Sequence, residues 1–563
     1  MVELIESFRA VVGRKHVLTR DRDTAYFRTG FRYGFGGARA VVMPGTLLEQ
    51  WRVLEIAVKA NCAIIMQATK TGLTGGSSPS GFEYDRDVVI INTTRIKGHR
   101  LLRAGKQVLA FPGTTLFEVG QDLKQVGRVP HSVLGSTSIG ATVVGGVANN
   151  AGGALCKRGS SYTELSMFAR VNAEGELELI DHLGISNLGQ TPEEILTNLE
   201  AGNFSEEDLG GDDRSASDSA YVDRIRDLDA AVPNRYNADP TRLCDVSGSA
   251  GKVACFAVRV DTFAAPVKTQ VFLLGTNDPT DFVSLRRHIL SNFEHLPEMC
   301  EYLNQATFRV AEKYGKDVAL AIKHLGTDRL PKAYALKAKA EYILNRVPLL
   351  PKYLPDIVLY HASKLFPQHL PDRLLAYRDQ YEHYLILVTA DEAIDEARAY
   401  LTDTWGRHEG VGFFECNERE QEAALLHRFS AAGAGIRYQN VHQRTTEEPL
   451  ALDVALLSSD PEWVETLPEE VTRDMVLALS YGHFICHVFH NIYVFRKGTD
   501  LEKMKTIMLD QLAERGAKFP AEHNFGHLYE ADEAVTDFHR TLDPTNTFNP
   551  GIGRTSKSMN RPN

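Results

Sequence analysis

Cysteine pairs of the C-x-x-C type are missing from this sequence, which has 563 residues and only seven cysteines. Their odd number and irregular spacing favour a reducing compartment over a disulfide framework or a zinc ribbon. The N-terminal segment lacks the basic stretch followed by an apolar stretch that opens a secretory signal. These absences predict a cytoplasmic location.

Long apolar runs are also missing, because no stretch of about 18 strongly apolar residues occurs, the length needed to suggest a membrane span. Residues 135–156 contain no charged side chain over a length that could cross a bilayer. The same stretch holds six glycines and two adjacent asparagines, which is a poor composition for lipid. We therefore reject a transmembrane helix at this position.

Positive charge is scarce overall, and the net charge of −11 argues against general nucleic-acid binding. Residues 305–380 are the exception, with 13 Lys and Arg against 7 Asp and Glu, a local charge of +6. Leu, Tyr, Pro and Phe are interleaved with these basic residues. One interpretation is a helical insertion with solvated lysines, and the other is a surface that sits on anionic phospholipid.

A chain of this length is expected to form two or three domains. Strand-like and helix-like segments alternate from residue 35 to residue 130, which indicates an α/β domain. A further strand is expected at residues 251–263. The acidic, Ser- and Gly-rich residues 202–220 are predicted to be a mobile loop.

The segment from Ala68 to Gly81 is rich in glycine, serine and threonine and lies between two strand-like runs. Glycine allows backbone N–H groups to approach a ligand closely, and clustered N–H groups with hydroxyls make a site for phosphate. The segment lacks the G-K-[ST] of a P-loop and the G-x-G-x-x-G of a Rossmann domain. A flexible surface turn is the alternative interpretation.

A second glycine-rich segment, "HSVLGSTSIGATVVGGVANNAGG" at residues 131–153, follows about sixty residues later. Two such segments in one α/β domain predict two backbones against the same extended ligand, and a dinucleotide with its pyrophosphate fits that requirement. Together with "KRGSSYTE" at residues 157–164, the pair resembles the FAD domain of the vanillyl-alcohol-oxidase superfamily.

This resemblance implies an α+β fold with a two-subdomain FAD-binding domain. In the superfamily the first loop wraps the pyrophosphate, the second runs along the flavin, and a strand matching residues 251–258 meets the adenine end. No His or Cys lies between Gln67 and Ser78, so the resemblance implies non-covalent FAD. The cofactor-binding residues that it implies are Ala68, Thr69, Lys70, Thr71, Gly72, Gly76, Ser77, Gly135, Thr142, Gly152 and Ala254.

A closer resemblance rests on "FRYGFGGARAVVMPGTLLEQWRVL", "AEHNFGHLY" and "DPTNTFNPGIGRTSK". In order and spacing these are similar to the bacterial respiratory, quinone-dependent D-lactate dehydrogenases, over nearly the whole chain. The resemblance implies an FAD-binding domain at residues 1–264 and 517–563. It also implies an α/β cap domain at residues 265–516 with a largely helical, membrane-contacting insertion at residues 305–380.

Histidines gather near the C-terminus. His483 and His490 are seven residues apart with His487 between them, and "AEHNFGH" adds Glu522, His523 and His527. On one helix face the first two could meet, whereas on one strand they would point to opposite sides. Such a group suits a metal site, an acid–base site or satisfied polar groups of the core.

His523 is the base that we expect to take the hydroxyl proton, since histidine titrates near working pH. In related FAD-dependent 2-hydroxy-acid dehydrogenases, two histidines seven apart and the Glu of an "EH" pair hold a divalent metal. His483, His490 and Glu522 match those positions. The relatives' Gly-Asp-Gly-Asn between the histidines is replaced here by "FICHVF", which puts the metal in doubt.

Arg428, in "LLHRFSAAGAG", matches the arginine that binds the substrate carboxylate in those relatives, and Arg437 is the alternative. A planar guanidinium can bind a carboxylate through two hydrogen bonds. A surface arginine on a helix is the plain interpretation of Arg428.

Together the resemblances predict a peripheral flavoprotein on the cytoplasmic face of the inner membrane. It would oxidise D-lactate to pyruvate through FAD and pass the electrons to membrane quinone. The alternative is a dehydrogenase of another D-2-hydroxy acid, such as 2-hydroxyglutarate, with a soluble electron acceptor. A flavin-free metallohydrolase and a membrane scaffold without turnover are the rivals from other classes.

Overall fold

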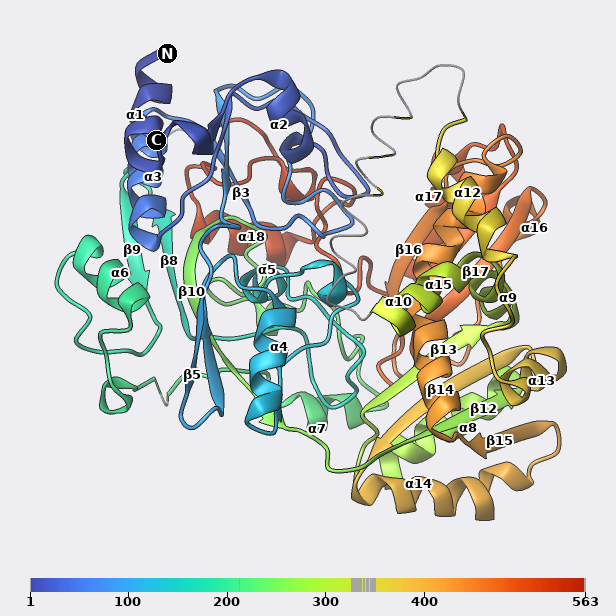
Figure 1. The fold of residues 1–563 in the computed structure, drawn as a ribbon. Helices are drawn as coiled ribbons and strands as arrows, with labels where there is room; N and C mark the ends of the chain where they lie inside the picture. The colour runs from blue at the N-terminus through green and yellow to red at the C-terminus, as the bar shows by residue number, and fades with distance from the viewer. Residues whose placement is uncertain are drawn as a thin grey trace.

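Two lobes stand side by side in the computed structural model of the protein (Figure 1). The elements up to β11 and the last helix, α18, form one lobe, and the elements from β12 to α17 form the other. The structure describes residues 2–211, 213–325, 337, 340, 344 and 351–560. The domain boundaries at residues 264 and 517 stay a prediction.

The first sheet of the N-terminal lobe has the order β1-β2-β4-β3. Its strands are β1 (Val17–Leu18), β2 (Ala40–Val42), β3 (Ala63–Gln67) and β4 (Val88–Asn92). The last three are parallel and almost completely buried, as is usual for strands with a continuous apolar run. Helix α3 (Leu47–Lys59) begins at Thr46, whose side chain accepts from the N–H of Glu49, and it connects β2 to β3.

The second sheet of this lobe is antiparallel, with the order β5-β6-β10-β8-β9. Its strands are β5 (His99–Leu102), β6 (Gln107–Ala110), β8 (Ser166–Val171), β9 (Leu177–Asp181) and β10 (Ala254–Asp261). The remaining elements of the lobe are α1 (Val2–Val12), α2 (Asp21–Arg28), α4 (Leu116–Gln125), α5 (Val143–Ala148), α6 (Pro192–Ala201), α7 (Tyr221–Arg226), α18 (Glu533–Leu542), β7 (Arg128–Val129) and β11 (Phe263–Ala264). The two glycine-rich segments follow β3 and β7.

The acidic segment that we predicted to be mobile, residues 202–220, is described except for residue 212. The N–H of Gly210 donates to Gly184 O at 2.9 Å, and that of Ser186 donates to Asp208 O at 2.9 Å. Arg259 donates to Gly210 O at 3.1 Å. The segment is therefore anchored to the β8–β9 side of the lobe, and its mobility stays a prediction.

The second lobe is built on a seven-stranded antiparallel sheet of order β15-β12-β14-β13-β17-β18-β16. Its strands are β12 (Thr269–Thr276), β13 (Met299–Asn304), β14 (His383–Ala390), β15 (Val411–Glu415), β16 (Leu450–Ala455), β17 (Met475–His483) and β18 (Val488–Phe495). The helices are α8 (Pro279–Asn292), α9 (Gln305–Tyr314), α10 (Lys316–Leu325), α12 (Leu354–Ser363), α13 (Asp372–Gln380), α14 (Glu392–Asp403), α15 (Glu418–His442), α16 (Glu469–Thr472) and α17 (Leu501–Glu514).

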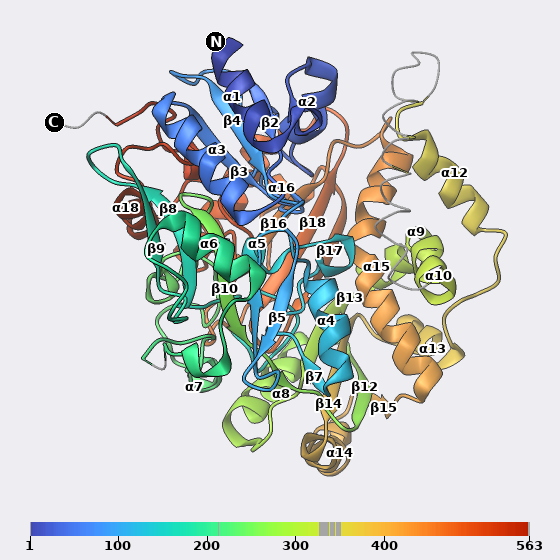
Figure 2. The same cartoon turned by 60° about the vertical axis from the view of Figure 1, so that its left-hand side comes forward.

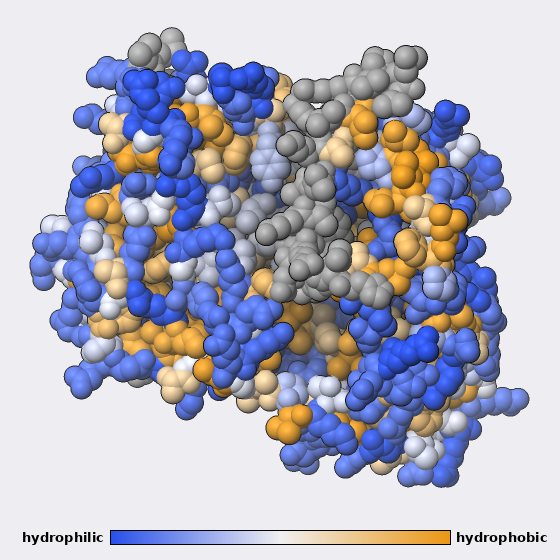
Figure 3. Space-filling view, viewed as in Figure 1, coloured by the Kyte–Doolittle hydropathy of each residue, from blue (hydrophilic) through white to orange (hydrophobic). Residues whose placement is uncertain are grey.

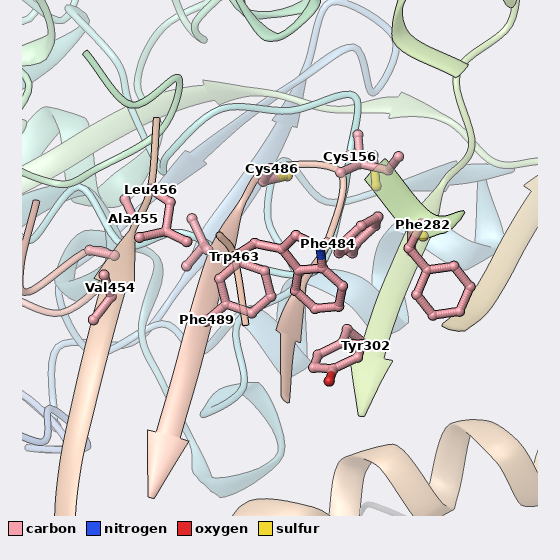
Figure 4. Packing of buried hydrophobic residues seen from close by; sticks show 14 of the residues in the cluster. Cys156, Phe282, Tyr302, Val454, Ala455, Leu456, Trp463, Phe484, Cys486 and Phe489 are labelled. Carbon is pink, nitrogen blue, oxygen red and sulfur yellow. The ribbon is translucent and has the colours of Figure 1, made fainter. Parts of the chain in front are cut away.

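An aromatic core fixes the hairpin of β17 and β18 (Figure 4). Trp463 stacks on Phe489 with ring centroids 5.6 Å apart, and it meets Phe484 edge-on at 4.9 Å. Tyr302 of β13 contacts Trp463 at 4.7 Å. Because Phe484 and Phe489 lie between His483 and His490 in the sequence, this packing holds the two histidines in place.

The predicted basic insertion is largely helical where the structure describes it. Helices α9, α10, α12 and α13 lie around α15, as Figure 2 shows. Residues 326–350 fall outside the described residues, except for 337, 340 and 344. Arg437 of α15 is buried and pairs with Asp317 and with Asp356, at 3.1 Å for the latter, so this arginine fastens the insertion to α15.

The C-terminal segment returns to the first lobe, as the resemblance implied. Ile64 of β3 donates its N–H to Thr547 O at 2.9 Å, and the N–H of Asn549 donates to Ile64 O at 2.7 Å. The Asn549 side chain donates to Gly76 O at 2.8 Å and to Ala250 O at 2.6 Å. One asparagine thereby ties the first glycine-rich segment to the loop before β10.

Candidate active site

The β17–β18 hairpin brings His483 and His490 together. His483 ends β17, whereas His490 lies in β18 opposite Tyr481. Residues 484–487 turn the chain, and the ring centroids of the two histidines are 5.1 Å apart. A hairpin therefore brings together two histidines that are seven residues apart. The single helix and the single strand considered from the sequence were both wrong.

Two carboxylates extend this row across neighbouring strands. Glu301 of β13 lies opposite His483, and its Oε1 accepts from His483 Nδ1 at 2.6 Å. Asp453 of β16 lies opposite His490, and its Oδ1 is 2.9 Å from His490 Nδ1. Directly opposed side chains on one face of a sheet are close enough to pair. Neither carboxylate was predicted from the sequence, because strand register decides their place and no local motif surrounds them.

Glu522 and His523 reach the cluster from the loop before α18. Asp453 Oδ2 accepts both of their backbone N–H groups, at 2.8 Å from Glu522 N and 3.1 Å from His523 N. The Glu522 carboxylate also pairs with Arg235, a residue that was not predicted from the sequence. The His523 ring stacks on His490 with centroids 5.9 Å apart, and its Nδ1 is 3.6 Å from Asp453 Oδ2.

Three ligand-type atoms face one another at the centre of the cluster. His483 Nε2 is 3.3 Å from Glu522 Oε2, His490 Nε2 is 3.7 Å from the same oxygen, and the two nitrogens are 3.4 Å apart. Ligands of a tetrahedral ion at about 2.1 Å would be separated by about 3.4 Å. The Nδ1 atoms of His483 and His490 pair with the carboxylates of Glu301 and Asp453, as in many metal sites. These residues fit a divalent metal.

Electrostatics favour the charged forms of His483 and Glu522 and the neutral form of His490. Burial alone would lower the pKa of His483, but Glu301 and Glu522 outweigh burial and raise this pKa to about 10. Burial would raise the pKa of Glu522, but Arg235 and His483 outweigh it, so this pKa lies far below its ordinary value. Burial lowers the pKa of His490. The described cluster is thus an array of compensated charges that is largely shielded from water.

Arg428 projects from α15 toward the same row. Its Nη2 is 2.7 Å from Glu301 Oε2, and its guanidinium lies 4.8 Å from the centroid of the Tyr481 ring. This position beside the cluster contradicts the plain interpretation of a surface arginine. Arg437, the alternative, is instead committed to the two aspartates of the helical insertion.

The two glycine-rich segments lie close together, and that they hold one ligand stays a prediction. The Thr69 methyl group lies 4.0 Å from where a Cβ on Gly140 would stand. The Asn524 side chain donates to Asn149 Oδ1 at 2.6 Å, and Thr74 Oγ1 donates to Asn524 O at 2.6 Å. Asn524 therefore holds both segments, and it directly follows His523.

The cradle retains open backbone and unused polar groups. No heavy atom lies within 4 Å of a Cβ built on Gly72 or Gly135. The hydroxyl oxygens of Ser78 and Ser138 are buried, and neither has a hydrogen-bond partner within the described residues. Open backbone and spare hydroxyls are what a dinucleotide requires, so the segments fit FAD.

Other residues that were predicted to bind the cofactor make contacts within the protein. Lys70 donates to Thr29 O at 2.8 Å, and Thr142 caps α5 by accepting from Gly145 N. Gly152 packs against the Glu522 side chain, since a Cβ on this glycine would stand only 2.6 Å from Glu522 Cγ. Ala254, at the start of β10, is fully buried. Backbone oxygens of Ala68, Gly76 and Ser77 accept from the side chains of Asn92, Asn549 and Gln67, respectively.

Known proteins resemble this chain over both lobes. A family described as "D-lactate dehydrogenase, membrane binding" matches residues 271–561, and one described as "FAD binding domain" matches residues 38–180. A quinone-dependent D-lactate dehydrogenase of Escherichia coli (strain K12) is 51% identical over 550 residues, which cover 98% of this chain and 96% of the relative. The chain belongs to the quinone-dependent D-lactate dehydrogenase family. A member from Haemophilus influenzae is 47% identical over 99% of this chain and 98% of its own.

Solved structures share the fold of this D-lactate dehydrogenase family member. A p-cresol methylhydroxylase with substrate bound aligns with a TM-score of 0.57 at 13% identity, over 99% of this chain and 97% of the other. An alkyldihydroxyacetonephosphate synthase gives 0.58 at 12% identity, over 98% and 84%. The predicted family, fold class and FAD-binding domain are therefore confirmed.

Proposed function

We propose that the protein is a peripheral membrane flavoenzyme that oxidises D-lactate to pyruvate and delivers the electrons to membrane quinone. The observation that carries the proposal is the position of His523. The next residue, Asn524, binds both glycine-rich segments, so the histidine lies at the border between the flavin cradle and the histidine cluster. Family membership supplies the substrate and the acceptor.

His523 is suited to take the hydroxyl proton of the substrate. Its side chain is 31% exposed, whereas those of His483 and Glu522 are 9% and 3% exposed. Since Nδ1 lies near Asp453, Nε2 is the ring nitrogen left to take the proton. Bound FAD would supply the acceptor for the hydride that leaves C2. His523 would hold the proton released as the hydroxyl becomes a carbonyl.

Arg428 is the proposed partner of the substrate carboxylate. Glu301 and the Tyr481 ring fix the guanidinium, so little side-chain freedom is lost when an anion binds. A carboxylate that meets this arginine would stand beside the His483–His490 pair. The hydroxyl of a small 2-hydroxy acid is then within reach of the histidine cluster.

A divalent metal held by His483, His490 and Glu522 is the remaining part of the proposal. It would supply a Lewis acid for the substrate oxygens, and Glu301 and Asp453 would orient its two imidazole ligands. The test is the metal content of purified protein and of Glu522→Gln, with Glu530→Gln as the control for an exposed glutamate. If Glu522→Gln and Glu530→Gln contained equal amounts of metal, or the wild type contained none, the proposed metal site would be excluded.

The membrane contact is proposed to include α12 and the residues after it. Val358, Leu365 and Phe366 are 56%, 87% and 51% exposed, and Figure 3 shows apolar surface over this part of the molecule. Lys352 and Lys364 lie beside them in the sequence. No helix of the described residues is long and apolar enough to cross a bilayer. Exposed apolar and basic side chains suit attachment to the face of an anionic bilayer, and we place this face on the cytoplasmic side.

Anaerobic flavin bleaching tests the activity directly. D-lactate, L-lactate and D-2-hydroxyglutarate are added in parallel to the yellow holoenzyme, and only D-lactate should bleach it quickly. An equal response to 2-hydroxyglutarate would favour the alternative substrate. The variant His523→Ala should keep its flavin and lose bleaching by D-lactate, whereas His408→Ala, at an exposed histidine, should behave as the wild type.

A further inference from the structure

An exposed aromatic surface occupies the flavin-binding lobe, far in sequence from the proposed membrane insertion. Seven aromatic side chains are strongly exposed among the described residues, and five of them gather here. The five are Tyr26, Phe31, Tyr33, Phe35 and Phe82, with exposed fractions from 39% to 65%. We call them the aromatic tip. An apolar patch of this kind usually marks a binding surface.

The fold holds the aromatic tip in place. The N–H of Gly30 donates to Gly34 O at 2.9 Å, which closes the turn that carries Phe31 and Tyr33. Gly81 donates to Phe35 O at 2.9 Å, and the rings of Phe35 and Phe82 meet at 5.8 Å. The turn that carries Phe31 and Tyr33 is therefore closed, and Phe35 is fixed beside Phe82.

Basic residues are frequent in the sequence on both sides of residues 26–35. Between Arg9 and Arg39 there are 8 Lys and Arg against 2 Asp and Glu, a local charge of +6 in a chain of net charge −11. Arg32 lies 5.7 Å from the Phe31 ring, whereas Arg28, 5.0 Å from the Phe35 ring, is buried and pairs with Asp21. Basic residues beside exposed aromatic rings are the composition of a segment at a bilayer interface.

Helix α2, at the start of the aromatic tip, and helix α12 of the proposed membrane contact lie toward the same end of the molecule. Helix α2, which contributes Tyr26, and helix α12 both lie at the upper end in Figures 1 and 2, which differ by a turn about the vertical axis. One flat surface can touch both lobes.

We infer that the aromatic tip is a second membrane-contacting surface, which inserts its rings at the headgroup level of an anionic bilayer. This inference rests on the proposed membrane association. The family region named for membrane binding covers residues 271–561 and does not include the tip. Contacts from both lobes would hold the flavin lobe at a fixed distance from the bilayer and keep the path to a quinone short.

Tryptophan quenching tests this contact. The three native tryptophans, Trp51, Trp405 and Trp463, are at most 5% exposed, so they are shielded from lipid. The variants are Phe31→Trp in the tip, Leu365→Trp in the proposed α12 contact, and Val267→Trp at a 96% exposed control position. Each holoenzyme is mixed with vesicles of brominated phosphatidylcholine and phosphatidylglycerol, and fluorescence is compared with unbrominated vesicles.

Quenching at positions 31 and 365 but not at 267 is the expected result. Quenching at 365 alone would overturn the second contact and leave the proposed function intact. Quenching at neither position, in protein that still oxidises D-lactate with a soluble dye, would overturn both membrane statements. Quenching at all three positions would mean unoriented adsorption and would also overturn the inference.

Vesicle affinity provides a second measurement. The double variant Phe31→Ser, Phe82→Ser should bind anionic vesicles roughly tenfold more weakly, since two aromatic side chains leave the interface. Val267→Ser should bind as the wild type does. Dye-linked oxidation of D-lactate checks that the variants are folded. Unchanged vesicle affinity in an active double variant would contradict the inference.

Discussion

Arg235 and Glu522 form an ion pair in which the side chains are only 1% and 3% exposed, although 287 residues separate them in the sequence. The arginine also donates to Leu155 O at 3.2 Å and to Arg158 O at 3.3 Å. Arg235 thereby joins the stretch directly after the second glycine-rich segment to the carboxylate of the histidine cluster. This single pair couples the proposed flavin cradle to the proposed metal and substrate site.

Removal of Arg235 is expected to leave a buried carboxylate without its cation. Arg235→Met should lower the free energy of unfolding by about 3 to 5 kcal/mol, the usual cost of breaking one partner of a buried pair. The double variant Arg235→Met, Glu522→Gln should recover part of that loss, because no uncompensated negative charge remains. Denaturant unfolding of the three proteins makes the comparison, and a stable single variant would contradict the coupling.

Asp453 is expected to act as a positioning residue. Its Oδ2 holds the backbone of Glu522 and His523, and its Oδ1 faces His490. Asp453→Asn should lower kcat by about 10- to 100-fold, the usual effect of losing such an outer partner. The flavin content should stay constant, and the pH profile of kcat should move. Asp537→Asn, at an exposed aspartate, is the control, and a variant at 453 with wild-type kcat and pH profile would exclude the role.

The members of the site that could be predicted from the sequence are those inside short motifs. His483, His490, Glu522 and His523 lie in two such stretches, and the structure brings all four together. The two glycine-rich segments could also be recognised, because several glycines in a short stretch of low charge indicate a close backbone approach. That they bind one ligand stays a prediction. Local sequence therefore indicated the chemistry of the cluster.

The remaining members depend on pairings that no local pattern encodes. Glu301 and Asp453 sit in ordinary strands, and they join the cluster because the sheet places β13 beside β17 and β16 beside β18. A shift of one residue in either register would turn these carboxylates to the other face of the sheet. Arg235 lies in no recognisable motif, so its role is evident only from its ion pair with Glu522 in the structure. Strand register and tertiary contact therefore limit what the sequence can predict of this site.

His539 predicts a specific loss of stability in acid. The residue is buried in α18, its Nε2 contacts Gly248 O at 3.1 Å, and burial lowers its pKa to about 4. The unfolded chain takes up this proton near pH 6.5 and the folded chain only near pH 4, so stability falls as the pH drops through that window. Nearby Lys252 acts in the same direction.

The variant His539→Gln should lose this dependence while keeping a donor for Gly248. Between pH 7 and pH 5, its free energy of unfolding should fall by about 2 kcal/mol less than that of the wild type. Denaturant unfolding at the two pH values provides the measurement. His408→Gln, at an exposed histidine, is the matched control, and equal pH slopes in all three proteins would refute the assignment.

Gly152 offers the sharpest test of how the second glycine-rich segment supports the site. A Cβ at this position would stand 2.6 Å from Glu522 Cγ and would overlap the carboxylate beyond it. Gly152→Ala should therefore displace a carboxylate that Arg235 and His483 hold from other sides, costing about 1 to 3 kcal/mol of stability. It should also reduce D-lactate oxidation.

Gly433→Ala in helix α15 is the control. A Cβ there meets nothing within 4 Å, so this variant should stabilise the protein by up to about 1 kcal/mol. If the two variants had the same free energy of unfolding and the same rate of D-lactate oxidation, Glu522 would have room to move, and the tight support proposed for the site would be wrong.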